Sequence, residues 1–202
     1  MLFNTSNAKT AGALLFAGGT QFVVSMIIAE AVYPNYSVSA NFISDLGVWG
    51  KMSAPVFNTS IVISGLLTLG AAFFIQKAFR KRGFSAIVAL SGAGPLVVGF
   101  FPENTVLVNG IPVIHSLAAL IAFIFGGLAA ITSYCLTISP FKYFSAALGA
   151  ISIIALVLFL GTINYGSLGL GAGGMERMIV YPTLLWVICF GGYLMAISEH
   201  IR

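Results

Sequence analysis

The sequence predicts an all-α integral membrane protein, a bundle of six transmembrane helices with its N and C termini in the cytoplasm. Its mean hydropathy is +1.04, and only 7% of its residues are charged, whereas about a quarter are charged in a soluble domain. Six apolar stretches each have about the 20 residues that cross the hydrocarbon core of a bilayer. The charges between these stretches are sorted by sign, as in membrane proteins of defined orientation.

The first three helices are expected over residues 11–32, 53–76 and 84–101. Pro34 ends the first, because a proline disfavours helix in the residue before it. Ser53 is expected to cap the second helix, with Pro55 tolerated in its first turn. Pro95 and the neighbouring glycines predict a kink in the third helix.

The last three helices are expected over residues 112–137, 144–163 and 175–197. The glycine-rich stretch 164–174 is interpreted as a flexible outer loop. Cys135 and Cys189 lie within apolar stretches, so they are expected to be buried as small hydrophobic residues rather than to form a disulfide. No long hydrophilic stretch interrupts the helices, and residues 1–202 are therefore expected to form a single membrane domain.

Small residues recur in pairs along the predicted helices. In lipid such residues let helix backbones approach closely, because the hydrophobic effect does not drive helices together there. Close helix packing is the first interpretation of these pairs, and a ligand groove is the alternative. The pairs are Gly18-Gly19, Ser64-Gly65, Gly126-Gly127 and Gly191-Gly192.

The distribution of charge predicts the orientation of the bundle. Seven of the nine cations lie at the termini and in alternate connections: Lys9, Lys77, Arg80, Lys81, Arg82, Lys142 and Arg202. Cytoplasmic connections are enriched in Lys and Arg, so this side is expected to be cytoplasmic, and the protein to be a multi-pass protein of the cell (plasma) membrane. Membrane orientation accounts for the basic charge without nucleic acid. The expected partner is the lipid bilayer, and no oligomeric state follows from the pattern.

Polar residues of the opposite, outer side form a predicted layer at the helix ends, which is the candidate site. Its members are Glu30, Ser44, Asp45, Glu103, Asn104, His115, Glu176 and Arg177. Charged groups in a membrane protein are costly and usually have a partner or a function.

Three interpretations of this layer stay open. In the structural one, Glu176 is stabilised by the positive end of its own helix, Arg177 pairs with Asp45 or Glu103, and His115 donates to a nearby carbonyl or carboxylate. In the second, a lipid head group or small ligand binds to a pocket of Glu30, Ser44, Asp45, Asn104, His115 and Arg177. In the third, His115, Asp45, Glu103 and Glu176 provide acid–base chemistry, or His115 is a metal ligand. No cofactor is predicted.

Several short motifs resemble a known family. They are Ile43-Ser44-Asp45-Leu46-Gly47, Gly99 to Pro102, His115 followed by small residues, and Glu176-Arg177 with Trp186. Together they resemble the prokaryotic membrane proteins grouped as domain of unknown function 998, and more distantly the damage-regulated autophagy modulator family. The resemblance implies six membrane helices and supplies no reaction. The chain departs from alkaline ceramidases, because His115 and His200 lie on opposite sides and form no three-histidine zinc site.

The sequence thus predicts a multi-pass membrane protein of uncharacterised activity, whose outer polar cluster is structural or binds a lipid or small ligand. A membrane-embedded enzyme acting on a lipid or its head group, with or without a metal, is the alternative, and the balance leans against an enzyme. A small transporter is the second alternative. The absence of charged residues near the centre of any predicted span argues against proton-coupled transport.

Overall fold

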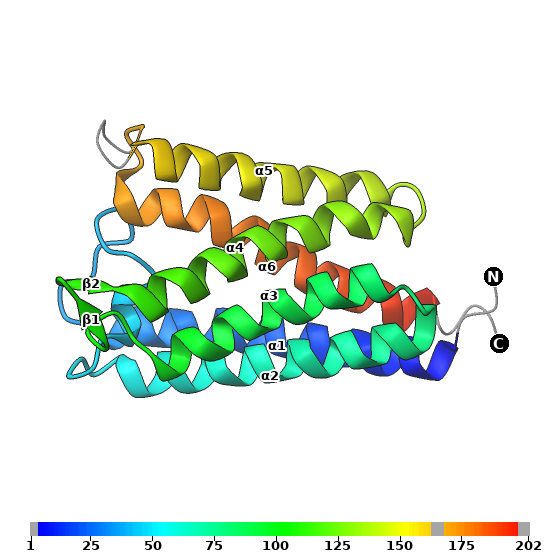
Figure 1. Cartoon of the computed structure of the whole chain (residues 1–202), viewed down its shortest axis with the longest axis horizontal. Helices are drawn as coiled ribbons and strands as arrows, with labels where there is room; N and C mark the ends of the chain where they lie inside the picture. Colours follow the sequence, from blue (N-terminus) through cyan, green and yellow to red (C-terminus); the bar gives the residue numbers. More distant parts are fainter. Residues whose placement is uncertain (1–3, 163–167, 198–202) are drawn as a thin grey trace.

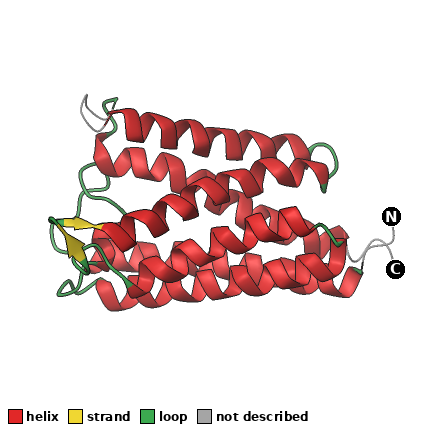
Figure 2. Cartoon of the chain, in the orientation of Figure 1, coloured by secondary structure: helices red, strands yellow, loops and turns green. Residues whose placement is uncertain are grey.

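The computed structural model describes residues 4–162 and 168–197. Within them, six helices are long and apolar enough to span a membrane, which confirms the predicted all-α six-helix bundle (Figures 1 and 2). These helices are α1 (Thr5–Val32), α2 (Ala54–Phe79), α3 (Arg82–Phe100), α4 (Val113–Thr132), α5 (Phe141–Thr162) and α6 (Gly171–Ile197). Two 3-10 helices, η1 (Ser44–Gly47) and η2 (Ser133–Cys135), and a small hairpin of β1 (Leu107–Val108) and β2 (Ile111–Pro112) lie in the connections.

Helix ends differ from the prediction where local capping was not recognised. The first helix begins at Thr5 rather than near residue 11, because the Asn4 side chain accepts a hydrogen bond from the Asn7 amide at 2.9 Å. An asparagine N-cap of this kind starts a helix one turn or more before the apolar pattern becomes continuous. Conversely, Ser53 does not cap α2 with its side chain. Its hydroxyl instead donates to the Leu46 carbonyl at 2.8 Å and ties the start of α2 to η1.

The largest correction concerns the glycine-rich stretch. Residues 171–174 were expected in a flexible loop, but they form the first turn of α6; residues 163–167 lie outside the described residues, as do His200 and Arg202. The reason is a close contact with the connection that follows α1. The Gly173 amide donates to the Ser39 carbonyl at 2.9 Å, and a Cβ at Gly173 would lie 2.6 Å from the Val38 oxygen. Only glycine lets that connection lie directly on the helix.

The helices are arranged so that α4 and α6 meet only weakly and α5 packs against both of them. Each of α1 to α4 packs against the next, α6 returns to pack against α1, and α5 lies outside against α4 and α6. Figure 1 shows α4 running obliquely, from α3 at one end of the bundle toward α5 at the other. As a result α4 and α6 contact each other far less than they contact their other neighbours.

The two ends of the bundle have different character. One end, here called the loop end, carries the connection 33–53, the β1–β2 hairpin and the start of α6; the other, the basic end, carries the α2–α3 and α4–α5 turns (Figure 1). Lys77, Arg80, Lys81, Arg82 and Lys142 all lie in or beside the two turns of the basic end. The charge pattern of the sequence therefore correctly predicted which connections lie together at each end of the bundle.

Glycines bring the helices into close contact, as the sequence predicted. A Cβ at Gly191 of α6 would lie 2.7 Å from the Gly12 oxygen and the Phe16 nitrogen of α1. A Cβ at Gly65 of α2 would lie 2.7 Å from the Gly92 oxygen of α3. Real side chains do not occupy such distances, so these positions fix how near the helix axes can lie.

The two cysteines were expected to be buried, and this prediction is wrong: Cys135 and Cys189 are both exposed on the surface of the bundle. The surface of a membrane bundle contacts hydrocarbon, so it is as apolar as the core. An apolar stretch therefore does not distinguish a residue that contacts lipid from one packed inside the protein.

Candidate functional site

A cavity lies inside the bundle and is the candidate functional site. Its volume is about 130 Å³. It is lined by Phe22 of α1 and by residues within 57–68 of α2, 91–98 of α3, 115–126 of α4 and 176–187 of α6, with Ile43 and Ser44 at the loop end. Eleven residues of helix rise correspond to about 16 Å, so the lined region extends from the loop end to near the middle of the span.

The walls of the cavity are apolar except at the loop end. Deeper hydroxyl groups other than that of Ser64 donate to carbonyls of their own helices, as Thr68 does to Ser64 at 2.9 Å and Ser91 does to Val88 at 2.8 Å. These groups are satisfied locally, so they leave the surrounding phenylalanine, isoleucine, valine and alanine side chains to set the character of the walls. The cavity is therefore amphipathic, with its polar groups gathered at one end.

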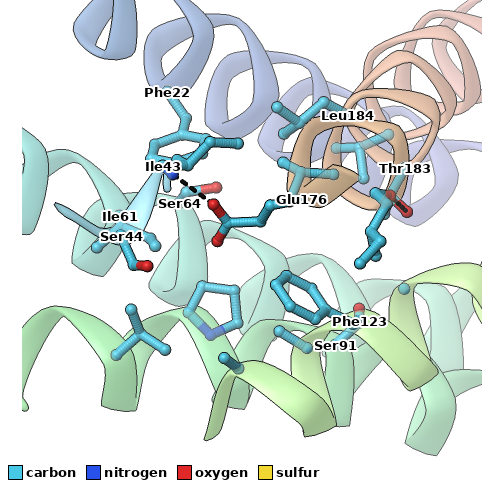
Figure 3. A pocket seen from close by; sticks show the side chains of 18 of the residues that line it. Phe22, Ile43, Ser44, Ile61, Ser64, Ser91, Phe123, Glu176, Thr183 and Leu184 are labelled. Atoms are coloured by element: carbon cyan, nitrogen blue, oxygen red, sulfur yellow. Dashed lines mark hydrogen bonds between the residues drawn. The ribbon is translucent and has the colours of Figure 1, made fainter. Parts of the chain in front are cut away.

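Glu176 is the central polar group of that end. Its side chain extends from α6 into the cavity, opposite Ser44 and near Phe123 (Figure 3). One carboxylate oxygen accepts a hydrogen bond from the Ile43 amide. No described residue donates a hydrogen bond to the other oxygen, although the side chain is buried, with an exposed fraction of 7%. A carboxylate in this position is unusual, because removing it from water is costly unless its hydrogen bonds are satisfied.

His115, Glu103 and Ser44 form a second polar group beside Glu176. The His115 Nδ1 atom lies 3.0 Å from the Phe101 carbonyl, and its Nε2 atom lies 3.5 Å from a Glu103 carboxylate oxygen. The same Glu103 oxygen accepts a hydrogen bond from the Ser44 hydroxyl. His115 and Ser44 line the cavity, whereas Glu103 lies behind them. The prediction that His115 donates to a nearby carbonyl is confirmed.

Arg177, although adjacent to Glu176, belongs to a different group. Its Nη2 atom lies 2.7 Å from a Glu30 carboxylate oxygen and 2.6 Å from the Tyr36 hydroxyl. Its Nη1 atom donates to the carbonyls of Val38, Asn41 and Gly173 at 2.8–3.1 Å. We call this network the arginine clamp: Arg177, Glu30, Tyr36 and the three carbonyls. It fastens the connection 33–41 to the ends of α1 and α6.

The Tyr36 hydroxyl is held in its neutral form within the clamp. Burial raises the pKa of Tyr36 to about 12, and the Arg177 guanidinium offsets only part of that rise. The protonated hydroxyl accepts from Arg177 and donates to the Phe42 carbonyl at 2.9 Å. Tyr36 was not among the predicted site residues. The sequence around it gives no signal of this role, because its partner Arg177 lies 141 residues away.

Asp45 and Asn104 make hydrogen bonds within the connections of the loop end and do not line the cavity. One Asp45 oxygen accepts hydrogen bonds from the Asn41 amide group at 2.9 Å and the Phe42 amide at 3.0 Å, at the start of η1. Asn104 exchanges two hydrogen bonds with the backbone of Trp49, at 3.0 and 3.1 Å. The predicted polar layer thus separates into a cavity group, the arginine clamp and these loop contacts.

Two details of the structural interpretation are corrected. Arg177 pairs with Glu30 and not with Asp45 or Glu103. Glu176 was expected in the first turn of its helix, but α6 begins five residues earlier at Gly171, so its first turn contains no acidic residue. The favourable effect of a helix N-terminus on an anion is confined to the first turn. Glu176 therefore depends on its hydrogen bond from Ile43 and on whatever contacts it in the cavity.

The predicted metal ligand His115 has one carboxylate neighbour. Among residues 4–162 and 168–197, no group of three or more His, Cys, Asp and Glu side chains is arranged to hold a metal ion. Asp45 is engaged with Asn41 and Phe42, and Glu103 accepts from Ser44.

These features define a class: a multi-pass α-helical membrane protein of six spans, with an amphipathic cavity between its helices. The chain belongs to the family described as protein of unknown function (DUF998), whose family pattern matches residues 16–193. The resemblance found in the sequence motifs is thereby confirmed. No curated protein and no solved structure matches the chain.

Proposed function

We propose that this protein binds a membrane amphiphile, with the polar head of the ligand at the loop end and the first part of its chain in the cavity. The observation that carries the proposal is the orientation of Glu176, whose carboxylate extends into a cavity that is otherwise apolar (Figure 3). A ligand with a polar end and a hydrocarbon end matches this gradient of polarity. A wholly apolar ligand would leave the carboxylate oxygen unsatisfied.

The volume of the cavity limits how much of the ligand it can hold. A dry apolar cavity of about 150 Å³ in another protein holds a molecule of the size of benzene. A cavity of about 130 Å³ therefore accommodates a short hydrocarbon segment of roughly six carbons. A longer chain would continue beyond it.

A purely structural role explains the arginine clamp better than it explains the cavity group. Both terminal nitrogens of Arg177 are engaged by Glu30, Tyr36 and three carbonyls, and only its buried Nε lacks a hydrogen-bond partner among the described residues. Glu176, by contrast, uses one oxygen to hold Ile43 and presents the other to the cavity. Residues Ser44, His115 and Glu176 are thus the proposed contacts of the head group.

We propose further that the loop end faces the outside of the cell membrane and that residues 1–202 form one membrane domain. The basic residues of the α2–α3 and α4–α5 turns support a cytoplasmic basic end by the positive-inside rule. The cavity then opens toward the outer leaflet, which is the source of the proposed ligand.

Cysteine labelling tests this orientation. In a background of Cys135→Ser and Cys189→Ser, Leu107→Cys at the exposed hairpin is expected to react with a membrane-impermeant maleimide added to intact cells. Lys81→Cys, exposed in the turn after α2, is expected to react only after the membrane is permeabilised. The reverse pattern would overturn the orientation and would place the cavity at the cytoplasmic leaflet.

Photolabelling tests the binding function. Purified protein in lipid nanodiscs is exposed to octanol that carries a diazirine on its chain, and the labelled peptides are identified by mass spectrometry. Saturable label is expected on the cavity-lining segments 115–126 and 176–187, and it is expected to fall as unlabelled 1-octanol is added. Ile154 and Val157 of α5, which are 59% and 64% exposed, report unspecific contact with lipid. Label confined to such surface positions, with no saturation, would refute the proposal.

A further inference from the structure

We infer that the ligand head is a hydrogen-bond donor, and in particular a protonated primary amine, rather than a phosphate or a carboxylate. This inference rests on the proposed function and specifies the chemistry of the same cavity. It follows from the hydrogen-bond donors and acceptors that face the cavity at the loop end.

Glu176 is the first acceptor. When Glu176 is ionised, its carboxylate only accepts hydrogen bonds, and it has room for several. The Ile43 amide occupies one oxygen, and the second receives no hydrogen bond from any described residue. An ammonium head would supply both the missing donors and the opposite charge, and such charge-assisted hydrogen bonds are about twice as strong as neutral ones.

Ser44 presents a second acceptor to the cavity, whereas both ring nitrogens of His115 face protein oxygens. The Ser44 hydroxyl gives its proton to Glu103, so its remaining lone pairs are what a ligand meets. The Nδ1 atom of His115 lies 3.0 Å from the Phe101 carbonyl, which can only accept, and Nδ1 must therefore carry the proton. Its Nε2 faces the Glu103 carboxylate oxygen at 3.5 Å. Glu176 and Ser44 thus offer acceptors to the cavity, and a primary ammonium has three donors for them.

No cation is available for an anionic head. Among the described residues that line the cavity there is no Lys or Arg. The adjacent Arg177 lies on another face of α6, where Glu30 balances its charge and the Tyr36 hydroxyl and three carbonyls accept from its terminal nitrogens. Lys51 of the same end lies over the Tyr33 ring, 4.7 Å from its centroid. A phosphate or carboxylate would meet acceptors and the negative charge of Glu176, which is unfavourable in a site removed from water.

The test measures competition for the cavity by four ligands that share one chain and differ in the head: octylamine, 1-octanol, octanoate and octyl phosphate. Each competes with the diazirine octanol for saturable labelling of the wild-type protein in phosphatidylcholine nanodiscs. The half-inhibiting concentration of octylamine is expected to be lower than those of octanoate and octyl phosphate by about tenfold or more, with 1-octanol between them.

Glu176→Gln is the informative variant. Glutamine keeps a carbonyl oxygen for the Ile43 amide but removes the charge, so the advantage of octylamine over 1-octanol is expected to disappear. Asp45→Asn is the matched control, because it removes a carboxylate of the same end that does not line the cavity; it is expected to leave the ranking unchanged. Thermal unfolding verifies that both variants are folded.

The binding function and the inferred head group are refuted by different results. If no saturable labelling occurs in the wild-type protein, the binding function itself is wrong. If labelling is saturable but octanoate or octyl phosphate competes as well as octylamine, the function stands and the inferred head group is wrong. The ranking in the wild-type protein decides this even if Glu176→Gln does not fold.

Discussion

Replacing Arg177 with methionine is expected to destabilise the folded protein by about 3–5 kcal/mol, the range found when one partner of a buried ion pair is removed. Arg177 has an exposed fraction of 4%. Its loss leaves the Glu30 carboxylate without its counter-charge and takes the guanidinium donors from the Val38 and Asn41 carbonyls. Methionine fills part of the volume, so the effect isolates charge and hydrogen bonding rather than packing.

The measurement is thermal unfolding in one detergent, monitored by fluorescence-detected gel filtration. For a chain of about 200 residues, 3–5 kcal/mol corresponds to a fall in Tm of roughly 6–20 °C. Lys51→Met is the matched control: Lys51 is exposed at the same end, with its ammonium 4.7 Å from the centroid of the Tyr33 ring, and its loss is expected to cost less than about 1 kcal/mol.

A double variant separates the ion pair from the rest of the clamp. Arg177→Met combined with Glu30→Met removes both charges, so it is expected to recover part of the stability lost in Arg177→Met. If Arg177→Met unfolds at the same temperature as Lys51→Met, the clamp does not stabilise the fold. If the double variant is no more stable than Arg177→Met, the unpaired Glu30 is not the source of the loss.

The fold was predictable because hydrophobicity and charge act over whole segments. Six apolar stretches with basic residues at alternate ends allow few arrangements of a membrane chain. Helix ends were less predictable because single side chains decide them: Asn4 extends α1 toward the N-terminus, and the contact of Gly173 with the connection after α1 turns an apparent loop into helix. A glycine's effect depends on what lies against it, which the sequence does not contain.

The sequence predicted which residues make up the candidate site but not which of them contact each other. Glu30, Ser44, Glu103, His115, Glu176 and Arg177 all make polar contacts at the loop end. Successive residues on a helix point about 100° apart, so Glu176 and Arg177 reach different neighbours although they are adjacent in the sequence. The choice of Glu30 over Asp45 as the partner of Arg177 depends on how α1 and α6 meet.

The cavity left almost no trace in the sequence. Its apolar walls read as ordinary membrane helix, and the same residue types occur where a helix packs and where it contacts lipid. The pairs Ser64-Gly65 and Gly126-Gly127 were the only hint, since a ligand groove was the alternative to close packing there. Ser64 and Gly126 line the cavity, whereas Gly65 and Gly127 lie against neighbouring helices. In each pair, one residue lines the cavity and the other lies at a close contact between helices.

The arginine clamp and the cavity are connected through one short segment. Arg177 fastens residues 36–41, and the chain continues directly into Ile43 and Ser44, which form the end of the cavity. The adjacent Glu176 holds that same segment by the Ile43 amide. Two neighbouring residues of α6 therefore position the end of the cavity, Arg177 through contacts with the protein and Glu176 with an oxygen left for a ligand.

Filling the cavity is expected to weaken binding about tenfold or more without loss of the fold. In Ala119→Phe, a benzyl group enters from α4 at a position that lines the cavity, and a ring of that size occupies most of a space of this volume. The half-saturating concentration for photolabelling by the diazirine octanol is expected to rise by about tenfold or more, which corresponds to about 1.4 kcal/mol of lost binding free energy.

Leu117→Phe is the control on the same helix. Leu117 is 58% exposed on the outside of the bundle, so the new side chain points away from the cavity and labelling is expected to stay unchanged. Ala119→Phe is expected to remain folded, with at most about 1–3 kcal/mol of overpacking cost. Wild-type saturation in a folded Ala119→Phe would show that the chain of the ligand does not enter the bundle. The cavity would then be a packing defect, and the unsatisfied oxygen of Glu176 would require a different explanation.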